Sequence, residues 1–160
     1  MDTKKIILIV LLGLCVMALG FSAPAMAQKK EILLGSILPM TGGDPEPGYH
    51  VFNGRTLAVE KINAEGGIKS MGGATIKFTN TDHQGKPEIA LAEAERLVRQ
   101  GVKIITGPFM SGIGLVLGQF CEKNRILLVL TNCVGYELTQ QGFKYITRHH
   151  FNNRICAQDL

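Results

Sequence analysis

From residue 31 onward, short apolar runs alternate with longer segments in which apolar residues recur every three or four positions. The runs are typical of buried strands, and the longer segments are typical of helices that pack on a sheet. Strands are predicted at 32–38, 75–79, 102–106, 126–130 and 145–147, with helices at about 51–65, 87–100 and 113–124. This alternation predicts an α/β fold, an open parallel sheet in a three-layer sandwich.

The first predicted helix begins at about Val51 and ends before the glycine pair at 66–67. One side of this helix is apolar and is expected to pack on the sheet: Phe52, Leu57, Ala58 and Ile62. Arg55 lies off that stripe and is expected to face water. The preceding segment, 41–48, is rich in glycine and proline and is expected to carry neither helix nor strand.

The first 27 residues follow another pattern. Lys4 and Lys5 precede the apolar run Ile6–Phe21, and small residues follow it up to Ala27. This order is typical of a secretory signal peptide cleaved after Ala27. One alternative is a membrane anchor, although the apolar run has 16 residues and a membrane span needs about 20. The other alternative is a lipoprotein that is modified at Cys15. The pattern predicts export to a bacterial periplasm, with no direct membrane anchor after cleavage.

Composition narrows the function classes. The chain has 160 residues, of which 46% are hydrophobic and 19% charged, with a net charge of +4. These values exclude a disordered chain and predict no nucleic-acid partner. After cleavage three cysteines remain, and Cys121 is expected to be a buried small hydrophobe. Its pairing with Cys133 stays open, and cysteine and histidine spacing predicts no metal site.

Candidate chemistry gathers in four loops that follow the predicted strands, at 39–49, 82–86, 107–112 and 131–135. In an open parallel sheet these loops meet at one edge, where unpaired amides and helix dipoles favour ligands. The Ser111 hydroxyl, with the amides of Gly112 and Ile113, could receive a carboxylate. The alternative is that Ser111 caps its own helix. Asp82 and His83 are expected to form a solvated turn.

Known catalytic motifs do not fit these loops. A phosphate-binding loop would carry a lysine after its second glycine, but Ile113 follows Gly112. Phe109 stands where a nucleophile elbow needs glycine. The glycines around Gly114 depart from the dinucleotide-binding spacing. The sequence therefore predicts no enzyme and no cofactor, with a small flavodoxin-like enzyme left as a rival.

Several motifs occur in a characteristic order along the chain. They are found at 32–42 (ILLGSILPMTG), 52–54 (FNG), 58–68 (AVEKINAEGGI), Asp82 with 84–87 (QGKP), 107–108, 111–112 and 137–139 (ELT). In this order the chain resembles the type I periplasmic binding proteins. Within them it is similar to the branched-chain amino-acid-type, Leu/Ile/Val-binding-protein-like substrate-binding proteins of ABC transporters.

The resemblance implies a receptor of two α/β lobes that closes on a small solute and presents it to ABC permease membrane subunits. It implies that Ser111, with Gly112, binds a ligand carboxylate. It places Asn132 at a carbonyl-donating position for an α-ammonium, and Val134 where the family commonly has threonine or serine. Tyr49 is the candidate aromatic wall. The departure at Val134 widens the expected solute from an amino acid to a related amide or carboxylate.

Members of this family are longer than this chain. The resemblance therefore implies that 28–160 is an incomplete N-terminal lobe, a fragment without the opposing half of the pocket. Such a fragment is expected to bind its solute weakly or not at all, because domain closure normally sequesters the ligand. The alternative is a ligand-sensing domain of a membrane receptor with the same fold.

Overall fold

The computed structural model describes residues 30–158. The predicted signal peptide, 1–27, lies outside the described residues. The strands are β1 (Glu31–Leu38), β2 (Thr75–Asp82), β3 (Ile104–Thr106), β4 (Leu127–Leu130) and β5 (Ile146–Arg148). The helices are α2 (Glu46–Ala64), α3 (Pro87–Arg99), α4 (Ser111–Asn124) and α5 (Asn153–Gln158), with short 3-10 turns η1 (Lys69–Met71) and η2 (Tyr136–Thr139). In this part of the chain, no helix has the length and apolar character needed to cross a membrane.

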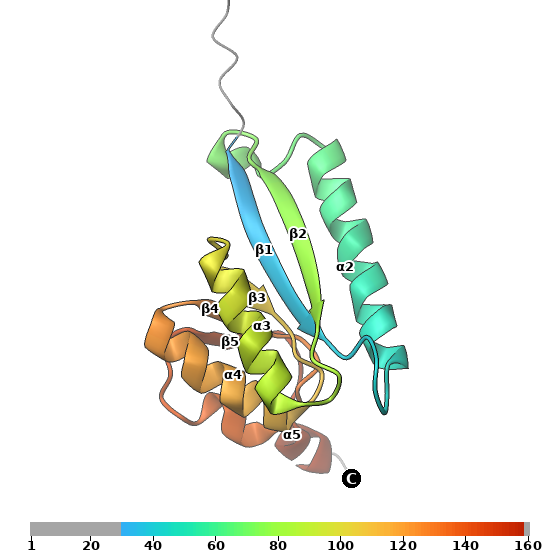
Figure 1. The fold of residues 1–160 in the computed structure, drawn as a ribbon, viewed down its shortest axis with the longest axis vertical. Helices are drawn as coiled ribbons and strands as arrows, with labels where there is room; N and C mark the ends of the chain where they lie inside the picture. The colour runs from blue at the N-terminus through green and yellow to red at the C-terminus, as the bar shows by residue number, and fades with distance from the viewer. Residues whose placement is uncertain (1–29, 159–160) are drawn as a thin grey trace, which may run out of the picture.

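The strands form one sheet in the order β2-β1-β3-β4-β5, and every neighbouring pair is parallel. The chain moves from β1 outward to β2 and then returns past β1 to β3 and β4. Because such crossovers are right-handed, the reversal places α2 on one face and α3 and α4 on the other. Figure 1 shows α3 and α4 in front of the sheet and α2 beside β2. The predicted α/β parallel sheet is confirmed.

The main core lies between the sheet and the α3–α4 layer. Alternate residues of β1 point toward these helices, and Gly35 packs so closely on Leu97 that an added Cβ would lie 2.9 Å from its Cδ1. Pro87 opens α3 at a position where a missing N–H leaves no intrahelical hydrogen bond unmade. The fully buried aliphatic residues of this core are Ile37, Ala90, Ala94, Leu97, Ile105, Leu117, Ile126, Leu128 and Leu130.

The prediction that 41–48 carries no helix is wrong at its end, because α2 begins at Glu46 rather than near Val51. Proline is tolerated in the first turn of a helix, so Pro47 does not prevent this start. Gly48 is buried there, and an added Cβ would lie 1.9 Å from the backbone oxygen of Pro39. The absence of a side chain therefore lets the first turn of α2 pack on the end of β1.

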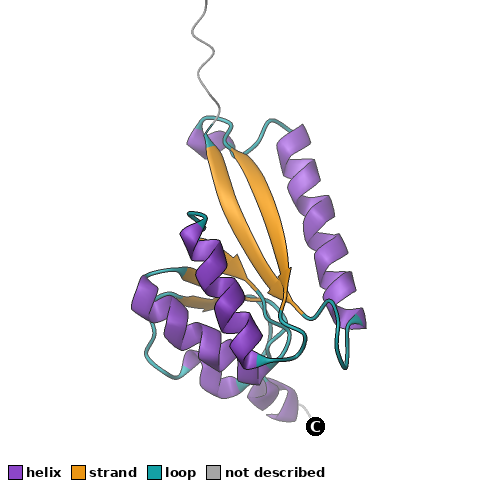
Figure 2. Cartoon of the chain, viewed as in Figure 1, coloured by secondary structure: helices purple, strands orange, loops and turns teal. Residues whose placement is uncertain are grey.

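The predicted buried face of α2 is right at Phe52 but wrong at Leu57, Ala58 and Ile62, which are exposed. Leu57 is 67% exposed and Ile62 is 37% exposed. The stripe that contacts the sheet begins at Phe52, whose ring stacks on Phe78 of β2 with a centroid distance of 6.0 Å. The stripe ends at Asn63, whose side-chain amide bonds both the N–H and the C=O of Ile76. Figure 2 shows this helix running along the β1–β2 side of the sheet.

Candidate functional site

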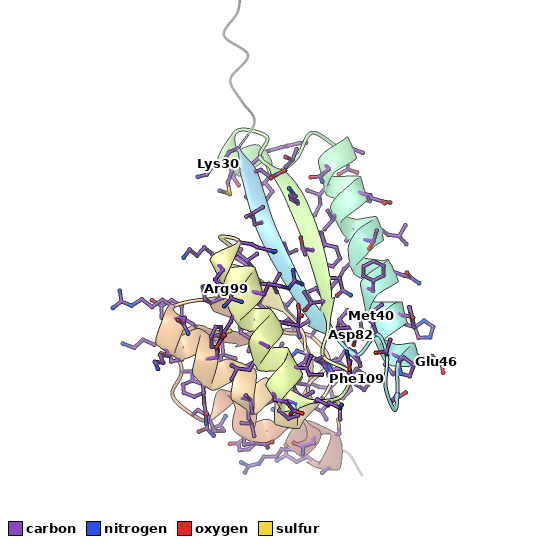
Figure 3. The ribbon with its side chains drawn as sticks, viewed as in Figure 1. Lys30, Met40, Glu46, Asp82, Arg99 and Phe109 are labelled. Atoms are coloured by element: carbon purple, nitrogen blue, oxygen red, sulfur yellow. The ribbon has the colours of Figure 1, made fainter. Side chains whose placement is uncertain are left out.

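The carboxyl ends of the parallel strands meet at one edge of the sheet, as predicted. Figure 3 shows Met40, Asp82 and Phe109 at this edge, whereas Lys30 lies at the opposite end of β1. Met40 follows β1, Asp82 ends β2, and Phe109 follows β3. Loops separated by more than 60 positions in the sequence therefore form one surface, which is the usual ligand edge of an open α/β sheet.

A cavity of about 390 Å³ opens at this edge. Its walls come from the first three of the four predicted loops: Pro39, Thr41, Gly43, Asp44, Gln84, Gly85, Phe109 and Met110. Met110 is 45% exposed, so an apolar side chain stands at the opening. Apolar walls with a few polar groups are typical of small-molecule sites. Phe109 and Met110 belong to a predicted loop but were not predicted as site residues, because a loop pattern does not show which side chains face a cavity.

Asp82 ties the first two loops together. Its carboxylate accepts hydrogen bonds from the amides of Met40 and Gln84, each at 2.9 Å, and from the Thr41 hydroxyl. Burial favours the neutral acid, but these bonds favour the carboxylate more strongly, so the pKa of Asp82 lies below its usual value. Asp82 is partly exposed, as expected for a solvated position, but it is the last residue of β2 and its carboxylate anchors the cavity wall.

His83, the next residue, is fully buried, so the prediction of a solvated turn is wrong for it. Its Nδ1 accepts a hydrogen bond from the Gly85 amide at 2.9 Å. The side chains of β2 alternate between the two faces of the sheet, so Asp82 and His83 point in different directions. Alternation along the strand was the signal that could have separated them.

Ser111 is the first residue of α4, and Met110 occupies the N-cap position. The Ser111 hydroxyl makes no cap bond to α4 and instead accepts a hydrogen bond from the Gly135 amide at 3.0 Å. The structure thus brings the 107–112 and 131–135 loops together through Ser111. The first intrahelical bond of α4 is donated by Gly114 to Met110, so the amides of 111–113 are free to meet an anion.

The other predicted site residues occupy different positions around this point. Gly112 is exposed in the first turn of α4, and Asn132 is half-buried in the loop after β4. Val134 is 37% exposed, and its carbonyl accepts a hydrogen bond from the Asn153 amide at 2.7 Å. Tyr49 lies in the first turn of α2, 49% exposed, and is not among the residues that line the cavity.

Arg55 lies behind this edge. The prediction that its side chain faces water is wrong. Its guanidinium bonds the hydroxyl of Ser36 at 2.5 Å and that of Thr131 at 2.6 Å. Burial lowers the pKa of Arg55 to about 10. Arg55 therefore joins α2 to β1 and to the loop after β4. Arg55 lies three residues after Phe52, and residues at this spacing share one face of a helix. This spacing was the signal that Arg55 faces the sheet.

The two buried cysteines are free thiols, so no bridge joins Cys121 to Cys133. Cys121 is completely buried in the core, as expected for a small hydrophobe. Cys133 donates a hydrogen bond to the carbonyl of Pro108 at 2.7 Å, a second link between the 107–112 and 131–135 loops. Burial raises the pKa of each thiol to about 12. Residues 30–158 hold no group of three acidic, histidine or cysteine side chains suited to a metal ion.

Comparison with known proteins gives consistent matches. A family described as periplasmic binding protein matches residues 31–154. Leu/Ile/Val-binding protein BraC3 of Rhizobium johnstonii is 30% identical over 144 residues, 90% of this chain and 36% of the relative. The Leu/Ile/Val-binding protein of Escherichia coli K12 is 32% identical over 138 residues, 86% of this chain and 36% of the relative. The chain thus spans about a third of the length of these relatives.

Solved structures agree with the sequence matches. The branched-chain amino acid transporter substrate-binding protein LivJ of Streptococcus pneumoniae, in complex with isoleucine, has a TM-score of 0.71 and 27% identity, covering 77% of this chain and 34% of that one. The leucine-binding protein LivK of Thermotoga maritima has a TM-score of 0.69 and 25% identity, and the match covers 78% of this chain and 34% of that one. This chain belongs to the periplasmic binding protein family, as a type I member of the branched-chain amino-acid type.

Proposed function

We propose that this chain is the N-terminal lobe of an exported solute-binding component of an ABC transporter. In this role it binds a small amino acid, or a related amide or carboxylate, for delivery to the permease membrane subunits in the periplasm. The role involves no catalysis. The family membership and the cavity at the carboxyl edge of the sheet support it, as do the names of the relatives, which are binding proteins.

The observation that carries the proposal is the start of α4. Three free amides, at 111–113, stand directly after Phe109 and Met110, which line the cavity. A helix N-terminus carries a partial positive charge, so a carboxylate placed there gains both hydrogen bonds and a favourable dipole. We assign the carboxylate-binding role to Ser111 and Gly112. The loop at 132–134 would meet the other polar groups of the solute, and Tyr49 would form an outer wall.

The incomplete pocket is part of the proposal. The matched relatives are far longer than this chain, and the alignment covers 36% of each of them. Small-molecule sites usually bury most of the ligand surface, whereas the groups described here come from one side. We therefore expect weak binding by this chain alone.

The test is replacement of Ser111 by alanine, followed by titration of the labelled chain with L-isoleucine and observation of amide shifts by NMR. Loss of one hydrogen bond to a charged group should weaken binding about tenfold. Ser70→Ala, an exposed serine in η1 at the other end of the sheet, should leave the affinity unchanged. Equal affinity in Ser111→Ala and the unmodified chain would reject the carboxylate-binding role of Ser111.

A further inference from the structure

His83 is a buried titratable group that the proposed binding role does not use. It has no exposed surface, although it lies only two residues before Gly85, a wall residue of the cavity. Its Nδ1 accepts the Gly85 N–H, so the ring proton of the neutral imidazole must lie on Nε2. Among the described residues, Nε2 has no hydrogen-bond partner.

The loop that His83 holds is conformationally demanding. Gln84 and Gly85 both adopt left-handed backbone conformations, with φ of 52° and 74°. The left-handed backbone conformation costs about 1–2 kcal/mol in a residue other than glycine. Three bonds hold the turn: Gln84 N–H to the Asp82 carboxylate at 2.9 Å, Gly85 N–H to His83 Nδ1 at 2.9 Å, and Lys86 N–H to the His83 carbonyl at 2.7 Å. Only the middle bond depends on an imidazole nitrogen, which can no longer accept a hydrogen bond once it is protonated.

The turn is in contact with the opposite wall of the cavity. An added Cβ at Gly42 would lie 2.7 Å from the carbonyl oxygen of Gln84, so the two loops touch through their backbones. Gln84 and Gly85 line the cavity on one side, and Thr41 and Gly43 line it on the other. A change in the conformation of the 84–85 turn would therefore change the shape of the cavity.

We propose that His83 is a pH-sensitive positioning residue for this wall. When the imidazole is neutral, its Nδ1 holds the Gly85 amide and fixes the turn. When a proton binds Nδ1, two N–H donors face each other across 2.9 Å and the bond is lost. The turn then relaxes, and the cavity wall formed by Gln84 and Gly85 moves with it.

The charges around the ring are consistent with this behaviour. Burial lowers the pKa of His83, while the charge of Asp82 acts in the opposite direction. Lys86 and Glu88, at the start of α3, are both exposed, and the first turn of α4 has no acidic residue. The neutral ring is therefore favoured at pH 7, and its protonation requires a lower pH than that of an unperturbed histidine. Asp82 titrates at lower pH and stays ionised over this range.

The test is a titration of the full chain, with 15N-labelled histidine and backbone, followed by NMR from pH 8 to pH 5 without any ligand. At pH 7.5 His83 should show the Nε2–H tautomer. The Gly85 amide signal should move with the same midpoint as His83, and its protection from hydrogen exchange should fall about tenfold as that bond is lost. A different tautomer, or a Gly85 signal that does not follow His83, would overturn the proposal.

Two variants separate positioning from a purely structural role. In His83→Asn, the side-chain oxygen can take the place of Nδ1 as acceptor without titrating, so the Gly85 signal should become independent of pH over this range. His50→Asn, which removes an exposed histidine of α2, should leave the Gly85 titration unchanged. A Gly85 titration that persists in His83→Asn would contradict the assignment. Since no ligand is used, these results do not depend on the proposed function.

Discussion

Two polar side chains, Asp82 and Arg55, give the ligand edge its shape at the scale of single residues. Asp82 joins the loop after β1 to the loop after β2 by accepting hydrogen bonds from both. Arg55 bonds hydroxyls of β1 and of the loop after β4. Asp82 contacts Met40, 42 positions away in the sequence, and Arg55 contacts Ser36 and Thr131, which are 19 and 76 positions away. The edge is therefore held by long-range polar contacts, in addition to the apolar core beneath it.

We expect Asp82→Asn to destabilise the chain by roughly 1 to 2 kcal/mol at pH 7, because an amide accepts these bonds less strongly than a carboxylate. The pH dependence gives a second readout. The pKa of Asp82 is depressed in the fold, so its contribution is present above the unfolded pKa of about 3.9 and is lost as pH falls through the lower folded value. Urea unfolding between pH 3 and pH 7 should show a flatter profile for the variant.

Asp44→Asn is the matched control, because Asp44 is exposed beside the same cavity. It should change the free energy of unfolding by less than about 0.5 kcal/mol. If Asp82→Asn and Asp44→Asn had equal profiles, the carboxylate of Asp82 would not be an anchor of these loops.

At the scale of elements, α2 is the helix that differs most from expectation. It starts five residues earlier than predicted and buries a different face. Its first turn packs against the end of β1 at Gly48, whereas Gly54 lies in the middle of the helix with open space around it. Two glycines in one helix thus have opposite roles, one required by close packing and the other costing helix stability.

These two glycines provide a prediction for α2. Gly54→Ala should raise the free energy of unfolding by about 0.5 to 1 kcal/mol, since alanine is the better helix former. Gly48→Ala should lower it by about 2 kcal/mol or more, because the methyl group would collide with the Pro39 backbone. Thermal and urea unfolding of the pair measure both effects. Equal shifts in the two variants would mean that α2 does not pack on Pro39.

The sheet was predictable because the segments of β1, β3 and β4 are short apolar runs, and β2 begins with alternating polar and apolar residues. The helix α3 was predictable for a similar reason, since its apolar stripe faces the core. The face of α2 was not, because this helix packs through a mixed stripe of Phe52, Arg55 and Asn63. Apolar periodicity cannot identify a face whose contacts are partly hydrogen bonds.

The candidate site was predictable only as a set of loops. Parallel topology requires the strand ends to share an edge, so the loop containing Ser111 could be placed there from sequence. The bond from Gly135 to Ser111 and the burial of His83 depend on tertiary packing that joins loops far apart in the chain. Whether Asn132, Val134 and Tyr49 contact a solute stays a prediction.

At the scale of the whole molecule, the chain is one α/β unit with a ligand edge built from one side. Its relatives are about three times longer than the part they share with it. A binding protein that closes on its solute gains affinity from both sides of the pocket. The described unit supplies the α4 amides and the apolar wall at Phe109 and Met110. A partial site of this kind should bind the solute at a defined place, the start of α4, but with weak affinity.

The most direct measurement is an NMR titration of residues 28–160, the chain without its predicted signal peptide, with L-isoleucine, compared with L-isoleucinamide, which lacks the carboxylate. The account predicts saturation only near or above about 1 mM, a weak affinity, with amide shifts concentrated at 109–113 and 131–135. It predicts that isoleucinamide does not produce the shifts at 111–113. Micromolar binding, or equal shifts at 111–113 with both compounds, would contradict a one-sided site that receives the carboxylate at the start of α4.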